Sequence, residues 1–294
     1  MAEPWQHFYQ SQRLRLAYWV WGDADKPPLL LVHGMRDHSR SWDRIAEAFC
    51  DRYRVVACDL RGHGDSDWTK GSHYEMPEFM LDLVTLIDLL GGQVDMVAHS
   101  MGGRASLIAA GVFPDRFRRI VAIEGTGGRF RAAPLPRGIE RMHEWAQRTR
   151  GMERREPRVY RSFADAVERV QEANPRLSRE MAEHLARWGA HAIDGGFSWK
   201  YDPWMYTQHD LEVPPEEYPL YWSGITAPVL HLISSDGEAT RGTRDGKPIA
   251  SFFPDAETRV IADSGHWIHH DQPEQVIAAI REFLGDPPGR APTE

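Results

Sequence analysis

The chain has 294 residues, enough to bury a large core in one elaborated domain or two small ones. Its 35 basic and 43 acidic residues give a net charge of −8, so we expect no nucleic-acid partner. The N-terminus lacks the basic and apolar regions of a signal peptide, and no run approaches the ~18 apolar residues of a membrane span, so we expect a cytoplasmic protein with no membrane partner.

The first half of the chain alternates predicted strands with predicted helices. Apolar runs predict strands at Leu14–Trp21, Leu29–Val32, Tyr53–Cys58, Val94–His99 and Arg119–Ile123. Helical periodicity or capping predicts helices at Ser41–Phe49, Met76–Leu90 and Arg104–Val112. This alternation predicts a parallel sheet with helices on both faces.

The pattern changes at Gly125. From there to Gly224 no buried-strand run occurs, and the predicted helices are Arg137–Arg150, Ser162–Ala173 and Ser178–Ala190. We interpret residues 125–224 as a helical cap over the sheet, and residues 1–124 and 225–294 as the core. In the last part, strands are predicted at Val229–Ile233 and Thr258–Ile261, and helical segments at Ile249–Phe253 and Glu274–Leu284.

A nucleophile elbow is predicted at the end of the strand Val94–His99. The apolar run stops at Ser100, and Gly102 and Gly103 then open the next helix. Small residues around a serine let the chain turn sharply enough to leave the hydroxyl exposed above the sheet edge. Ala98 stands where the G-x-S-x-G pattern has its first glycine, and it is small enough for this turn. A serine after a strand also serves as a helix N-cap, so the rest of the chain must separate the two interpretations.

A serine hydroxyl needs a base to take its proton, and His266 is the candidate. It follows the last predicted strand directly, which puts it at the same edge of the sheet as Ser100. His269 and His270 come soon after, but no metal-ligand spacing with a distant carboxylate accompanies them. We therefore expect no metal and interpret His269 and His270 as solvated surface residues.

The oxyanion of a tetrahedral intermediate requires two backbone N–H donors. One is the amide of Met101, directly after the predicted nucleophile. The other is expected in the loop after His33-Gly34, most simply the amide of Met35.

Four motifs, each at a predicted strand end, occur together in the chain. They are Leu31-Val32-His33-Gly34, Asp59-Leu60-Arg61-Gly62-His63-Gly64-Asp65-Ser66, His99-Ser100-Met101-Gly102-Gly103 and Gly265-His266-Trp267. In this order, over most of residues 10–285, the chain resembles the α/β-hydrolase superfamily, in particular its serine esterases and lactonases. The resemblance implies a mostly parallel eight-stranded sheet with an inserted helical cap. For Asp59, Arg61 and His63 it implies a loop-shaping role near the oxyanion hole.

The triad acid departs from the family's commonest pattern, in which it is the aspartate of a G-x-x-D motif after the penultimate strand. In this sequence the penultimate strand is followed by Asp236, Gly237 and Glu238, and Gly237 stands at the expected aspartate position. The rival is Glu124, which ends the strand after the nucleophile helix, a place used by a glutamate in some branches of the superfamily. A carboxylate there is costly to bury without a partner, which a cationic imidazole or an arginine such as Arg129 would supply. All three carboxylates therefore remain candidates for the triad acid, and we favour Glu124 over Asp236 and Glu238.

The serine nucleophile narrows the reaction that the resemblance implies. Dehalogenases and epoxide hydrolases of this fold use aspartate at the elbow, so the main prediction is hydrolysis of a carboxylic ester or lactone, with no cofactor. A carbon–carbon bond hydrolase of diketone-type substrates is the second enzyme class. A slow, hydrolase-like receptor for small molecules is the alternative that is not an enzyme. The expected partner is a small-molecule substrate, and the sequence is compatible with a homodimer.

The predicted cap supplies the candidate substrate contacts. Trp145, Trp199 and Trp204 are expected to line an apolar acyl pocket, the alternative being a small core within the cap itself. Arginines that alternate with glutamates either attract an anionic substrate or, as we favour, form a solvated face. These arginines are Arg148, Arg150, Arg154, Arg155, Arg158 and Arg161.

Overall fold

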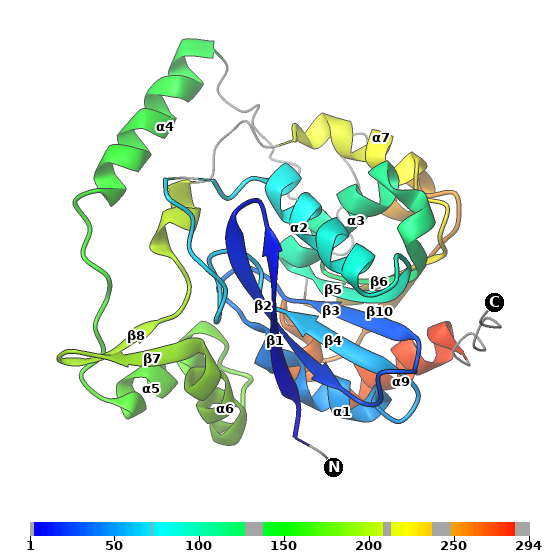
Figure 1. Ribbon diagram of the computed structural model, residues 1–294, viewed down its shortest axis with the longest axis horizontal. Coiled ribbons are helices and arrows are strands. Elements are labelled where there is room, and N and C mark those ends of the chain that lie inside the picture. The colour runs from blue at the N-terminus through cyan, green and yellow to red at the C-terminus, as the bar shows by residue number, and fades with distance from the viewer. Residues whose placement is uncertain (1–2, 72, 127–137, 208–212, 237–247, 286–294) are drawn as a thin grey trace.

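The computed structural model describes residues 3–71, 73–126, 138–207, 213–236 and 248–285. One eight-stranded sheet is flanked by helices, and a group of helices with a two-stranded hairpin stands beside it (Figure 1). The predicted α/β fold with a mostly parallel eight-stranded sheet is confirmed.

The sheet combines an antiparallel edge with a parallel centre. Its strands are β1 (Trp5–Ser11), β2 (Leu14–Trp21), β3 (Pro28–Val32), β4 (Arg54–Cys58), β5 (Val94–His99), β6 (Phe117–Ile123), β9 (Val229–Ser234) and β10 (Ala256–Ile261). They follow the order β1-β2-β4-β3-β5-β6-β9-β10. The pairs β1/β2 and β2/β4 are antiparallel and the other pairs are parallel. Because parallel strands end at one edge, the loops after β3, β5, β6, β9 and β10 meet at the same rim.

Strand β1 was not among the predicted elements. It is an edge strand rich in polar residues, and most of its side chains are exposed or half-buried. The turn into β2 consists of Gln12 and Arg13, both with positive φ, of 46° and 71°. Such two-residue turns usually contain glycine or asparagine, so the sequence lacks the usual signal for this hairpin.

Two apolar layers hold the sheet between its helices. Along β3, Leu30 and Val32 contact the layer under α2 (Met76–Leu89) and α3 (Ser100–Val112). Leu29 and Leu31 contact the opposite layer, under α1 (Asp43–Phe49) and α9 (Pro273–Leu284). All four side chains are fully buried. Successive strand residues point to opposite faces, which explains why a continuous apolar run marks this central strand.

The segment between β6 and β9 contains three longer helices and a hairpin. Its helices are α4 (Gly138–Met152), α5 (Phe163–Ala173) and α6 (Arg179–Gly189). Strands β7 (Ala190–Ile193) and β8 (Gly196–Trp199) pair antiparallel across the turn Asp194-Gly195. The expectation of helices alone in this segment is therefore wrong, and Asp-Gly was the hairpin signal that it overlooked.

One short element differs from the prediction, and two short helices were not predicted. Residues Ile249–Phe252, in a predicted helical segment, form only a 3₁₀ turn, and the additional helix α8 (Ile268–Asp271) precedes α9. Helix α7 (Tyr218–Ser223) lies against α3, where a Cβ on Gly111 would come within 2.3 Å of the Tyr221 carbonyl oxygen. None of the helices in the described residues is long and apolar enough to cross a membrane.

Candidate active site

Ser100 occupies a sharp turn between β5 and α3. Its φ is +50°, in the left-handed region that non-glycine residues rarely adopt. A Cβ on Gly102 would lie 2.2 Å from the His33 carbonyl oxygen, and a Cβ on Gly103 would lie 2.6 Å from the Cα of Gly125. The elbow can therefore pass so close to the neighbouring strand ends only because both positions are glycine.

His266 lies opposite Ser100, on the loop between β10 and α8. Its Nε2 is 2.9 Å from Ser100 Oγ, within hydrogen-bond reach. The buried His99 donates an Nε2–H to the His266 carbonyl oxygen at 2.9 Å. Asp271 accepts a hydrogen bond from the Gly265 amide at 2.8 Å. These contacts hold the backbone on both sides of His266, while its side chain stays 46% exposed and accessible to a substrate.

Of the three candidate acids, the structure brings Glu124 next to His266. Glu124 Oε2 lies 3.9 Å from His266 Nδ1, an ion-pair distance that is longer than a hydrogen bond. Asp236 instead pairs with Arg176 and is 52% exposed. Glu238, the third candidate, lies outside the described residues, as does Arg129.

Glu124 is held by Ser234, a residue that the sequence analysis missed. Glu124 Oε1 accepts hydrogen bonds from the Ser234 amide at 2.6 Å and from Ser234 Oγ at 2.8 Å. Burial by itself raises the pKa of Glu124, but His266 and the two Ser234 donors outweigh burial and lower the pKa below its usual value. Glu124 is therefore an anion at neutral pH, with its second oxygen left to face the imidazole.

The loop that carries Met35 is fixed by two buried histidines. His33 donates an Nδ1–H to the Gly34 carbonyl oxygen at 2.7 Å and accepts the Leu60 amide at 3.0 Å. His63 accepts the Arg36 amide at 3.0 Å, and burial lowers the pKa of His63 to about 4. Because neutral imidazoles can accept these amides, the pair joins the β3 loop to the loop after β4.

Asp59 and Arg61 form contacts within the protein scaffold. Asp59 accepts hydrogen bonds from the amides of Ser39 and Asp65, at 2.7 and 3.0 Å. The buried Arg61 guanidinium forms a bidentate contact with Asp82, at 2.6 and 2.8 Å. Asp59 thus contacts residues of the loops after β3 and β4, and Arg61 contacts α2; a role near the oxyanion hole stays a prediction.

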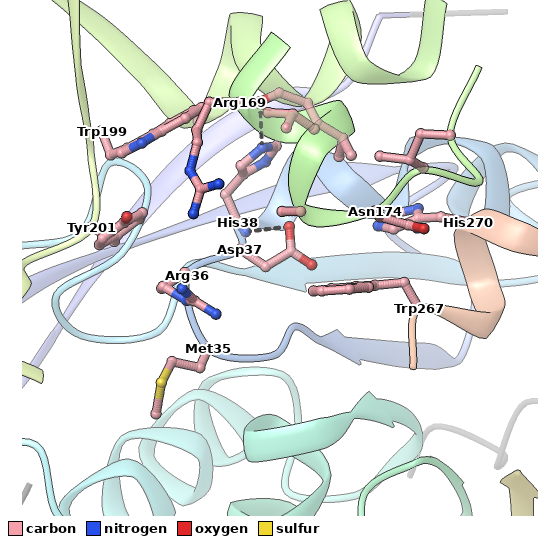
Figure 2. A pocket seen from close by; sticks show the side chains of 15 residues that line it. Met35, Arg36, Asp37, His38, Arg169, Asn174, Trp199, Tyr201, Trp267 and His270 are labelled. Carbon is pink, nitrogen blue, oxygen red and sulfur yellow. Dashed lines mark hydrogen bonds between the residues drawn. The ribbon is translucent and has the colours of Figure 1, made fainter. Parts of the chain in front are cut away.

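A cavity of about 130 Å³ is lined by residues next to the loops of Met35 and His266, although neither Ser100 nor His266 itself lines it. Met35 and Trp267, neighbours of the oxyanion loop and of His266, form one side of it (Figure 2). Helices α5 and α6 form the other side, and His38 Nε2–H donates to the Leu185 carbonyl oxygen of α6 at 3.0 Å. The segment between β6 and β9 thus supplies one wall of a cavity whose other wall includes the loop that carries Met35.

Of the three tryptophans expected at the pocket, Trp199 lines this cavity. Trp145 lies on α4, and Trp204 packs against the main core, so neither is among the lining residues. Tyr201, stacked on Trp199 with ring centroids 6.2 Å apart, lines the cavity and was missed. Trp199 ends the hairpin that the sequence analysis overlooked, so its surroundings were outside that prediction.

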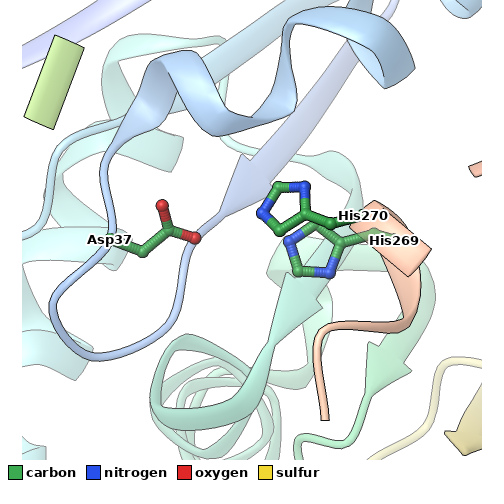
Figure 3. Close-up of side chains that lie close together, drawn as sticks. All are labelled: Asp37, His269 and His270. Carbon is green, nitrogen blue, oxygen red and sulfur yellow. The ribbon is translucent and has the colours of Figure 1, made fainter. Parts of the chain in front are cut away.

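Three residues behind the site could hold a metal ion. One ligand atom from each of Asp37, His269 and His270 lies within 4.8 Å of the others (Figure 3). Both Asp37 oxygens also accept hydrogen bonds, from the His38 amide at 2.9 Å and from Ser41 Oγ at 3.0 Å.

The expectation that His269 is a solvated surface residue is wrong. Its side chain is only 3% exposed and stacks on Trp42 with ring centroids 4.6 Å apart. Among the described residues neither of its ring nitrogens has a hydrogen-bond partner. The short helix α8 turns His269 inward, and sequence spacing alone could not indicate this direction.

Comparisons with known proteins place the chain among hydrolases. A family profile described as the alpha/beta hydrolase fold matches residues 27–273. A serine hydrolase-like protein of Danio rerio is 26% identical over 279 residues, covering 90% of this chain and 83% of the relative. Esterase YbfF of Escherichia coli (strain K12) is 25% identical over 270 residues, covering 88% and 93%. A thioesterase domain from the curacin biosynthetic pathway has a TM-score of 0.83 at 20% identity, covering 95% and 99%.

Proposed function

Because the chain belongs to the α/β-hydrolase family, we propose that it is a serine hydrolase that cleaves a carboxylic ester or a lactone. The observation that carries this proposal is the 2.9 Å contact between Ser100 Oγ and His266 Nε2, with Glu124 on the other side of the imidazole. An esterase among the relatives supports an ester as the substrate.

The proposed reaction proceeds through an acyl-enzyme. Ser100 Oγ attacks the carbonyl carbon while its proton moves to His266 Nε2. The carbon–oxygen bond to the alcohol then breaks, and the leaving alkoxide takes that proton. Water next attacks the acyl group in the same manner, which releases the acid and restores Ser100. Glu124 keeps the imidazole proton on Nδ1 and stabilises the imidazolium that forms twice in each cycle.

The backbone amides of Met35 and Met101 are the proposed oxyanion donors. Such preorganised N–H groups stabilise the charge that develops on the carbonyl oxygen. The bonds of His33 and His63 hold the loop that carries Met35, so this donor needs no rearrangement during the reaction. Residues 125–224 act as a cap in this proposal, because α5, α6 and Trp199 wall a cavity that Met35 and Trp267 also line.

Replacement of the nucleophile tests the proposal. Ser100→Ala is expected to abolish hydrolysis of 4-nitrophenyl hexanoate and labelling by a fluorophosphonate. Ser106→Ala is the matched control: Ser106 lies on the same helix, is fully buried, and its Oγ has no hydrogen-bond partner in the described part of the chain. This control should keep both activities. Turnover by Ser100→Ala at the wild-type rate would contradict the mechanism.

The same assay separates the two alternative functions. Stoichiometric labelling of Ser100 without turnover of any ester would indicate a receptor. Faster cleavage of a diketone ring-fission product than of simple esters would indicate a carbon–carbon bond hydrolase.

A further inference from the structure

Two cavities beside the loop that carries Met35 share four of their lining residues. The first is the cavity of about 130 Å³ beside Met35 and Trp267. The second, of about 330 Å³, lies under the hairpin β7–β8. Both are lined by Arg36, Arg169, Trp199 and Tyr201. A ligand that extends from the first cavity into the second must therefore pass two guanidinium groups and two aromatic rings.

The charge of this passage is opposite to that of the whole protein. The chain carries a net charge of −8, yet the second cavity is lined by four arginines against Glu156 alone. The two arginines that line only this cavity are Arg155 and Arg158. Arginine binds carboxylate groups in a planar, bidentate manner, and aromatic walls strengthen such contacts by excluding water. Arg155 and Arg158 are exposed, as expected of a solvated face, and they also line this cavity.

Asp37 is the acidic residue that lines the first cavity, and its two oxygens already accept hydrogen bonds from the His38 amide and from Ser41 Oγ. Glu172 contacts Arg169 at 3.1 Å but is itself 66% exposed, so solvent screens this ion pair.

Arg36 and Arg169 reach the first cavity from two different elements. Arg36 has a φ of +63°, and its amide donates to His63 at 3.0 Å, so its main chain is held by a buried side chain. Arg169 extends from α5 toward the cavity, opposite the loop of Arg36 (Figure 2). The two guanidinium groups thus approach one ligand position from the sheet side and from the α5 side.

We infer that the substrate is an anionic ester whose carboxylate, a few bonds from the scissile carbonyl, binds between Arg36 and Arg169. This inference rests on the proposed function for the position of the carbonyl. Arg36 directly follows Met35, and both residues line the first cavity with Arg169, so the loop that carries the proposed oxyanion donor also carries one side of the anion site. Trp199 and Tyr201 contact the carbon chain between the two ends of the substrate.

A matched pair of esters tests the inference. Mono(4-nitrophenyl) adipate and 4-nitrophenyl hexanoate have the same six-carbon acyl chain and differ only in the terminal carboxylate. The wild type is expected to hydrolyse the adipate ester with a kcat/KM at least tenfold higher, in line with a hydrogen bond to a charged group. Added salt should reduce this preference. Arg36→Met and Arg169→Met should each reduce it about tenfold, and Arg169→Lys should restore part of it.

An exposed arginine of the same segment provides the control. Arg161 lines neither cavity, so Arg161→Met should keep the preference for adipate. Melting temperatures of all variants identify any that fail to fold. Hydrolysis of both esters at equal rates, with Ser100 labelled, would overturn the anionic substrate and leave the proposed function standing.

If neither ester is hydrolysed, the proposed function is overturned. A binding measurement then still tests the anion site. Ser100→Ala is titrated by calorimetry with hexanoate, hexanamide and hexyl phosphate. Hexanoate should bind at least tenfold more tightly than hexanamide, and Arg169→Met should remove the difference. Equal affinities for hexanoate and hexanamide would overturn the inference. Tenfold tighter binding of hexyl phosphate than of hexanoate would overturn the assignment to a carboxylate.

Discussion

Replacing Glu124 by glutamine removes one charge from the proposed triad and leaves its shape intact. Opposite unit charges 3.9 Å apart attract by about 4 kcal/mol at an effective dielectric constant of about 20. Because the His266 side chain is 46% exposed, solvent screening reduces this to about 2–3 kcal/mol. Each 1.4 kcal/mol corresponds to about a tenfold change in rate, so Glu124→Gln should lower kcat/KM about 30- to 140-fold.

Asp236→Asn is the matched control for this prediction. Asp236 pairs with Arg176 at the surface, where both side chains are about half exposed. Surface ion pairs contribute about 0–1 kcal/mol, so this variant should keep its kcat/KM within about threefold of the wild type.

The assay is the kcat/KM for 4-nitrophenyl hexanoate at pH 7.5, with the melting temperature of each variant. The Glu124→Gln side chain can still accept the two Ser234 hydrogen bonds through its amide oxygen, so its loss of rate should exceed its loss of stability. Equal and small losses in both variants would refute the role of Glu124. A larger loss in Asp236→Asn would transfer that role to Asp236.

Two further predictions concern stability. Gly102→Ala should cost about 3 kcal/mol, or about 6 °C in melting temperature, because its Cβ would lie 2.2 Å from the His33 carbonyl oxygen. Gly151→Ala, in α4 with nothing within 4 Å of the new Cβ, should be neutral or stabilising; equal shifts in both variants would contradict the packing argument. The pKa of Asp37 is raised to about 7 in the folded protein, so its stabilising contribution is complete below the unfolded value near 3.8 and is lost as the pH rises through 7. The free energy of unfolding of Asp37→Asn, compared with that of the wild type, should therefore rise by at least about 1 kcal/mol between pH 5 and pH 8, or by about 2 °C in melting temperature. A difference between the two melting temperatures that stays constant over this pH range would contradict the raised pKa of Asp37.

The sheet and the elbow could be predicted because their signals are local. Leu29–Val32 is apolar at every position since both faces of β3 are covered, and Ser100 lies between small residues since its turn brings backbones together. The position of His266 followed from its place after a strand at the same sheet edge. Where such signals were weak, as in the polar edge strand β1, the prediction failed.

The choice of acid could not be made from the sequence. Glu124 and Asp236 both follow strands, β6 and β9, that are neighbours in the sheet, so both end at the same rim. Ser234 and Arg176 separate them: the first holds Glu124 toward the imidazole, and the second pairs with Asp236 at the surface. Neither contact leaves a pattern along the chain, because each joins residues from different elements.

The sequence alone determined the strands and helices of the central sheet and the places of Ser100 and His266 at its rim, since apolar periodicity and small residues act over a few neighbouring positions. Only the tertiary structure decided which side chains surround the cavity. Arg36 lies in the β3 loop and Arg169 on α5, and they face one cavity because α5 and α6 pack beside that loop, with His38 bonded to Leu185. Contacts between distant segments depend on how whole elements pack, and this information is spread over many residues of the chain.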